Sequence, residues 1–152
     1  MTKINIADVT ELRAQTEMSI LDVKKALEEA GGDKKAALEL LKKRGAEIME
    51  KKQERTAGNG IVEGYVHAGR IGVLVEVNCE TDFVARGDDF KTFVHDLALQ
   101  ICSMAPANVE ALLEQEWIKD SKKTIATLLA DITGKLGERI VIKRFTRMEL
   151  GE

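Results

Sequence analysis

Apolar residues recur at helical spacing through the first third of the chain. They form three stripes, Val9–Leu12, Ile20–Leu27 and Ala37–Leu41, in which residues three or four positions apart are apolar. Residues at that spacing share one side of a helix, so each stripe predicts a helix with one buried side. The pattern therefore predicts a small bundle of three helices, of the kind that binds partner proteins.

Capping residues mark the ends of these helices. Ser19 and Asp33 can each accept a backbone N–H at a helix start, and Gly31-Gly32 can end the second helix because glycine adopts the left-handed cap conformation without strain. Gly45 is expected to close the third helix. Beyond it, residues 46–55 are expected to continue as a charged helix.

The chain is expected to divide near residue 56, where residues 56–60 read as a linker rich in glycine. Residues 1–55 would then form a helical domain with its following linker helix, and residues 56–152 an α+β core domain. The core is expected to contain strands at 61–67, 71–79 and 140–148 and helices at 90–104, 109–116 and 125–136. The predicted fold class is α+β, a three-helix bundle followed by a three-stranded antiparallel sheet with helices packed on one face.

One face of this sheet is left uncovered in the prediction. Alternate residues from Ile71 to Val77 can face the helices, which places on the opposite face Leu74 and some of Val141, Phe145 and Tyr65. A two-fold contact between identical sheets would cover two such faces at once, so we expect a homodimer through the core sheet. The alternative is that the linker or the bundle covers the sheet of a monomer.

Phe83 lies between the second strand and the long helix that follows it. Glu80, Thr81 and Asp82 end the strand, and a regular helical pattern resumes only at Asp88. An aromatic side chain on a short connector between rigid elements is suited to insertion into another protein. The alternative is that Phe83 folds under the following helix as part of the core. Spacing alone leaves both interpretations open.

Composition describes a globular protein with no recognisable reaction chemistry. The 152 residues are 44% hydrophobic and 32% charged, and their net charge of −3 disfavours nucleic acid as a partner. No apolar run approaches membrane-spanning length and no signal core begins the chain, so we expect a cytoplasmic protein that does not engage a membrane. The cysteines and histidines lack metal-ligand spacing, and no nucleophile stands in a known context. We expect neither enzyme activity, nor a cofactor, nor a metal.

Three motifs resemble the elongation factor Ts family, the nucleotide-exchange factors of elongation factor Tu. The most specific is Asn-Cys-Glu-Thr-Asp-Phe-Val-Ala-Arg at residues 78–86, which is similar to the family's core signature. Residues 12–27 match the N-terminal signature at Leu-Arg, Thr and Asp-Val-Lys-Lys-Ala-Leu, and residues 140–150 resemble the C-terminal strand. The motifs occur in the family's order along nearly the whole chain.

The resemblance implies a role for each part. The bundle looks like the family's ubiquitin-associated-type domain, which docks on the nucleotide-binding domain of elongation factor Tu, and the implied docking residues are Leu12, Arg13, Ile20 and Leu21. In the family, an aspartate and a phenylalanine intrude near the magnesium and phosphate site of Tu and favour release of GDP. The implied exchange wedge is Thr81, Asp82, Phe83 and Val84. The partner would be elongation factor Tu, both GDP-bound and nucleotide-free.

The sequence departs from the family pattern in two places. Glu-Met-Ser-Ile-Leu at residues 17–21 stands where members usually have Gly-Ala-Gly-Met-Met. The region between Pro106 and Lys123 is short and lacks the second core subdomain and helical hairpin of longer members. Two other classes stay open: a ubiquitin-associated-type adaptor without exchange activity, which leaves residues 81–86 unexplained, and a small nucleic-acid-binding factor, which the acidic second half disfavours.

Overall fold

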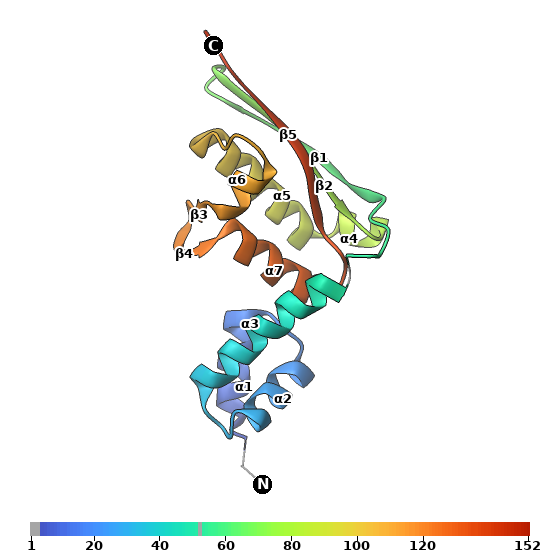
Figure 1. The fold of residues 1–152 in the computed structure, drawn as a ribbon, viewed down its shortest axis with the longest axis vertical. Coiled ribbons are helices and arrows are strands. Elements are labelled where there is room, and N and C mark those ends of the chain that lie inside the picture. Colours follow the sequence, from blue (N-terminus) through green and yellow to red (C-terminus); the bar gives the residue numbers. More distant parts are fainter. Residues whose placement is uncertain (1–3, 52) are drawn as a thin grey trace.

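The computed structural model describes residues 4–51 and 53–152 and confirms the α+β class (Figure 1). A helical bundle forms one end of an elongated molecule, and helices cover one face of a sheet at the other end. The bundle contains α1 (Ile6–Thr16), α2 (Ile20–Glu29) and α3 (Lys34–Lys51). The remaining elements are β1 (Asn59–His67), β2 (Ile71–Cys79), α4 (Asp82–Arg86), α5 (Asp88–Met104), α6 (Val109–Glu114), β3 (Glu116–Trp117), β4 (Asp120–Thr124), α7 (Ile125–Leu136) and β5 (Val141–Glu149).

The capping residues of the bundle act as predicted. The Ser19 hydroxyl accepts the backbone N–H of Asp22 at 3.1 Å, and the Asp33 carboxylate accepts that of Lys35 at 2.8 Å. Gly31 and Gly32, with φ of 62° and 91°, lead the chain out of α2 in a conformation that favours glycine. The apolar sides of the helices then form a core of their own, made of Val9, Leu12, Met18, Val23, Ala26, Leu27, Ala37 and Leu41.

The prediction that Gly45 closes the third helix is wrong, because α3 continues through it to Lys51. Gly45 is buried against α7, and a Cβ built on it would lie 3.6 Å from the carbonyl oxygen of Ala130. The glycine allows two helices to approach each other, and good helix formers on either side keep α3 intact. The charged helix predicted over residues 46–55 is present as the end of α3 as far as Lys51, and residues 53–55 form a turn.

The sheet has the strand order β1-β2-β5, and both neighbouring pairs are antiparallel. The predicted turn at residues 68–70 joins β1 to β2, with positive φ at Ala68 and Gly69. The buried side of β2 packs on α5, and its core residues are Val73, Val75, Val77 and Cys79. This arrangement buries one face of the sheet and leaves the other face to solvent.

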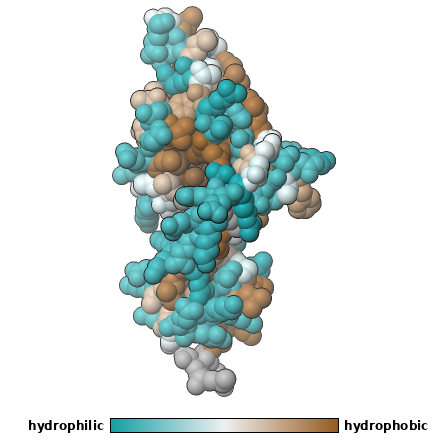
Figure 2. Space-filling view, turned by 45° about the vertical axis from the view of Figure 1, so that its right-hand side comes forward, coloured by the Kyte–Doolittle hydropathy of each residue, from teal (hydrophilic) through white to brown (hydrophobic). Residues whose placement is uncertain are grey.

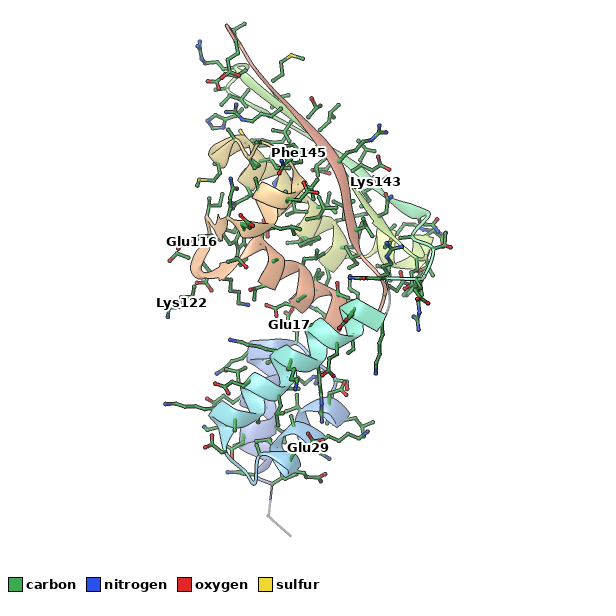
Figure 3. All side chains as sticks on the ribbon, viewed as in Figure 1. Glu17, Glu29, Glu116, Lys122, Lys143 and Phe145 are labelled. Carbon is green, nitrogen blue, oxygen red and sulfur yellow. The ribbon has the colours of Figure 1, made fainter. Side chains whose placement is uncertain are left out.

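Tyr65 and Phe145 lie on the helix side of the sheet, not on the outer face considered for them from sequence. Tyr65 pairs with Val73 and Phe145 with Val75, and both pack against the main core. In Figure 3, Phe145 lies on the helix side of β5 and Lys143 on the opposite side. A register shift opposite Glu76 and Val77 breaks strict alternation in β5, which is why Phe145 faces the core.

The β3–β4 hairpin was not predicted. Its strand residues are mostly polar, so the sequence carries no alternating apolar signal there. A fully buried side chain, Gln100 of α5, fixes the hairpin by donating to the carbonyl of Glu116 at 3.0 Å and accepting the N–H of Ile118 at 2.9 Å. Together with Trp117, which packs against the main core, this buried amide holds the hairpin.

The bundle packs directly against α7 of the core. Glu17 lies at this junction, and Figure 3 shows it beside α7. The Lys135 ammonium lies 2.9 Å from the Glu17 carboxylate of the bundle and 3.2 Å from the Asp89 carboxylate of α5. Lys135 therefore connects the bundle to two helices of the core.

Candidate functional site

The residues of the predicted wedge lie at the start of α4, a short helix that follows β2. Thr81 is its N-cap, with extended backbone, and its hydroxyl accepts the N–H of Val84 at 3.3 Å. Ala85 is buried and Val84 packs at the edge of the main core. The helix is thus attached to the core along one side, while its first turn projects from the molecule.

Phe83 is exposed over 83% of its surface, so the interpretation of Phe83 as a core residue is wrong. Among residues 4–51 and 53–152, it is the most exposed large apolar residue. Asp82 precedes it and forms an ion pair with Arg86 across one helical turn. An apolar ring and a carboxylate are therefore presented together, on a helix whose other side is anchored.

The acids near this turn have separate partners. Glu76 pairs with Arg144 on the outer face of the sheet, at 2.7 Å, and Glu80 accepts the backbone N–H of Arg139 at 2.7 Å. Asp82 has Arg86. Among residues 4–51 and 53–152, no group of three or more His, Cys, Asp or Glu side chains is arranged to hold a metal ion.

A carboxylate that the sequence did not single out lies behind the wedge. Glu138, in the connection between α7 and β5, accepts the backbone N–H groups of Glu80 and Thr81 at 3.0 and 3.1 Å and the hydroxyl of Thr81 at 2.6 Å. It stands 57 residues from Thr81 along the chain, so no local pattern could have revealed it. Beside it, burial raises the pKa of the Cys79 thiol, and the charge of Glu138 raises this pKa further.

The predicted docking residues of the bundle differ in exposure. Ile20 and Leu21 are 47% and 69% exposed on the first turn of α2, and Arg13 is exposed on α1. Leu12 is only 2% exposed and belongs to the bundle core, so its side chain supports the surface from behind. Ile20 and Leu21 thus form an apolar patch at the end of a helix.

The outer face of the sheet carries a second apolar surface. It is formed by Val62 and Val66 of β1, Leu74 of β2 and Met148 of β5, all exposed. Figure 2 shows hydrophobic side chains gathered over the half of the molecule that contains the sheet, whereas the bundle surface is mostly hydrophilic.

The described helices include none that is long and apolar enough to cross a membrane.

Comparisons with known proteins agree on one family. The profile of the family described as Elongation factor TS matches residues 80–152. Elongation factor Ts of Desulfitobacterium hafniense is 40% identical over 198 residues, which cover 100% of this chain and 91% of that protein. Elongation factor Ts of Coprothermobacter proteolyticus is 39% identical over 196 residues, which cover 99% of this chain and 100% of that protein. Elongation factor Ts of Myxococcus xanthus is 38% identical over 197 residues, which cover 100% of this chain and 91% of that protein.

These alignments are longer than the chain itself, which has 152 residues. The relatives therefore carry residues within the aligned region that have no counterpart here. The fold described above does not depend on those residues, since the sheet and its covering helices form one continuous core.

Proposed function

The chain belongs to the elongation factor Ts family of translation elongation factors, and we propose on that basis that it promotes release of GDP from elongation factor Tu in the cytoplasm during translation elongation. The observation that supports this most is the exposure of Phe83 beside Asp82 on the anchored helix α4. The protein would act as a guanine-nucleotide exchange factor, and it would not be an enzyme.

Release by a wedge needs no covalent chemistry. Magnesium and a phosphate-binding backbone hold a diphosphate largely by electrostatic attraction. Insertion of Phe83 and Asp82 beside such a site would displace the groups that hold the ion and the phosphates. Each tenfold gain in release rate requires that the free-energy barrier to release fall by about 1.4 kcal/mol. A few well-placed contacts would therefore raise the rate by several orders of magnitude.

Thermodynamic linkage sets a condition on this mechanism. If the protein weakens the binding of GDP to elongation factor Tu, then GDP must weaken the binding of the protein by the same factor. The protein would therefore bind nucleotide-free Tu more tightly than Tu that carries GDP. An adaptor that leaves the affinity of Tu for GDP unchanged would bind both forms equally.

The bundle would supply docking affinity. Ile20 and Leu21 present an apolar patch, and such a patch buried at the centre of an interface contributes strongly to binding. The close approach of α3 to α7 and the contacts at Lys135 hold the bundle against the core. Docking by one would then present the other to the same partner molecule.

The outer sheet face would pair with that of a second chain. Val62, Val66, Leu74 and Met148 leave an apolar surface in water, and a two-fold contact would cover both copies of it. The Glu76–Arg144 ion pair lies on the same face. The molecular mass of the protein in solution tests this homodimer.

Exchange is tested by the release of a fluorescent GDP analogue from elongation factor Tu in the presence of excess unlabelled GDP. We expect the release rate to rise with the concentration of this protein and then to saturate. A rate that stays at the intrinsic value, although the two proteins bind, would replace exchange with the adaptor function.

A further inference from the structure

We propose that Glu138 is a positioning residue for nucleotide exchange, because its carboxylate fixes the turn that presents Phe83. The inference rests on the proposed exchange function and extends it to a residue outside the wedge. Glu138 is half-buried, in the connection between α7 and β5, and contacts the backbone of Glu80, just before the wedge, and of Thr81, its first residue.

Three donors converge on this one carboxylate. One oxygen accepts the N–H groups of Glu80 and Thr81, and the other accepts the Thr81 hydroxyl. Hydrogen bonds to an ionised acceptor are roughly twice as strong as those between neutral groups. The turn between β2 and α4 is therefore fixed from outside its own segment.

The contact with Thr81 also determines how α4 begins. Because the Thr81 hydroxyl gives its hydrogen to Glu138, its lone pairs are free to accept the N–H of Val84. That second bond is the N-cap of α4. Glu138 thus orients the cap, and the cap orients the first turn, on which Phe83 stands.

The position of Glu138 is itself held from the other side. The next residue, Arg139, donates its backbone N–H to the carboxylate of Glu80 at 2.7 Å and a guanidinium N–H to the carbonyl of Arg55 at 2.6 Å. The two segments are thus joined by hydrogen bonds in both directions. The Glu138 carboxylate accepts N–H groups at the end of β2, and the Glu80 carboxylate accepts an N–H group of the connection between α7 and β5. This reciprocity gives the turn one conformation before any partner binds.

A preformed turn matters for exchange because an exposed aromatic on a mobile loop must be ordered when it binds. Ordering costs free energy that would otherwise lower the barrier to release. Displacement of reacting groups by about 1 Å can reduce a rate by up to a hundredfold. Loss of the Glu138 contacts should therefore reduce the saturating release rate more than it weakens binding.

The test uses the 152-residue chain with Glu138 replaced by alanine, glutamine or aspartate. Glutamine keeps the reach of the side chain and can still accept both N–H groups, whereas aspartate keeps the charge but is one methylene shorter. The control is Glu149→Ala, which removes another half-buried, ion-paired carboxylate, at the far end of β5. Amide hydrogen exchange at Glu80 and Thr81 is measured in the free protein, and fluorescent GDP release from elongation factor Tu is measured at saturation.

We expect Glu138→Ala and Glu138→Asp to speed amide exchange at both positions and to lower the saturating release rate about tenfold. The affinity of these two variants for nucleotide-free Tu should change by less than about threefold. Glu138→Gln and Glu149→Ala should stay within about threefold of the unaltered chain in amide exchange, release rate and affinity. The contrast between glutamine and aspartate separates reach from charge, even if the alanine variant does not fold.

Three results would overturn the proposal. They are amides that remain protected in Glu138→Asp, fast amide exchange with an unaltered release rate, and a glutamine variant as slow as the aspartate variant. If the unaltered chain itself fails to stimulate release, the proposed function is wrong and this role of Glu138 falls with it. The amide measurement, made without elongation factor Tu, still shows in that case whether Glu138 orders the turn.

Discussion

Gly45 of α3 and Gly134 of α7 face each other where the two helices cross. A Cβ built on Gly134 would lie 3.9 Å from the Gly45 Cα and only 2.8 Å from the Met18 sulfur. Two glycines at a crossing let helix backbones approach closely, which buries Met18 between the bundle and the core. The helical bundle is therefore packed on the core and is not merely tethered to it.

Substitutions at Gly45 test this packing. We expect Gly45→Ala to keep or slightly raise stability, because its Cβ would make an ordinary contact with Ala130 and alanine favours a helix by about 1 kcal/mol over glycine. Gly45→Leu should separate the bundle from α7, since a backbone carbonyl cannot move aside. Thermal unfolding should then show two transitions in place of one. A single unchanged transition in Gly45→Leu would contradict the close crossing.

Lys135 should stabilise the fold up to alkaline pH. Burial lowers its pKa, but hydrogen bonds and charges from Glu17 and Asp89 outweigh burial, so the pKa lies above the usual 10.5. Its contribution is therefore complete below pH 10.5 and is lost as pH rises through the higher pKa of the folded state. Lys135→Met should cost about 1 kcal/mol at pH 7, since both carboxylates are largely exposed.

Urea unfolding at pH 7 and at pH 11.5 measures the effect of Lys135→Met. The difference from the unaltered chain should shrink at the higher pH. Lys91→Met, at an exposed lysine of α5, is the control and should show little difference at either pH. An equal effect of Lys135→Met at both values would show that its packing, and not its charge, stabilises the junction.

Leu21→Asp tests the docking role of the bundle. Because Leu21 is exposed at the start of α2, we expect the fold to be unaffected and the affinity for elongation factor Tu to fall by about tenfold or more. The release rate at saturation should be retained. Ile118→Asp, at another exposed apolar residue, serves as control. Unchanged affinity in Leu21→Asp would exclude this patch from the interface.

Light scattering at micromolar concentration tests the dimer. We expect twice the 16.8 kDa mass of one chain, and the mass of a single chain for Leu74→Arg, which would bring charge into the apolar outer face. Lys122→Glu, on the hairpin away from the sheet, should leave the dimer intact (Figure 3). A mass of 16.8 kDa that does not change with concentration would reject the dimer.

Local patterns predicted most elements, because helical and strand periodicities and caps such as Ser19 are properties of neighbouring residues. The predictions failed where contacts with segments far along the chain determine the local structure. Gly45 resembles a helix end in sequence, but α7 determines its role. A shift in register turned Phe145 to the core, and a buried amide, Gln100, holds a hairpin that has no apolar pattern.

The candidate site divides in the same way. The motif around Phe83 could be recognised in sequence, but its exposure could not, since spacing allowed a core position as well. Glu138 gave no signal, because it meets Thr81 only through the packing of α7 and β5 beside β2. Residues that support a site from a distant segment are thus found from structure.

The central claim is that the exposed ring of Phe83 speeds release of GDP, and Phe83→Ala tests it most directly. The measurement is the saturating release rate of fluorescent GDP from elongation factor Tu, with thermal unfolding of the variant as a check on its fold. Because the ring is 83% exposed, the melting temperature should not change, while the rate should fall by about tenfold or more, as truncation of a central interface aromatic costs about 2 kcal/mol. A folded Phe83→Ala variant that releases GDP as fast as the unaltered chain would contradict the account.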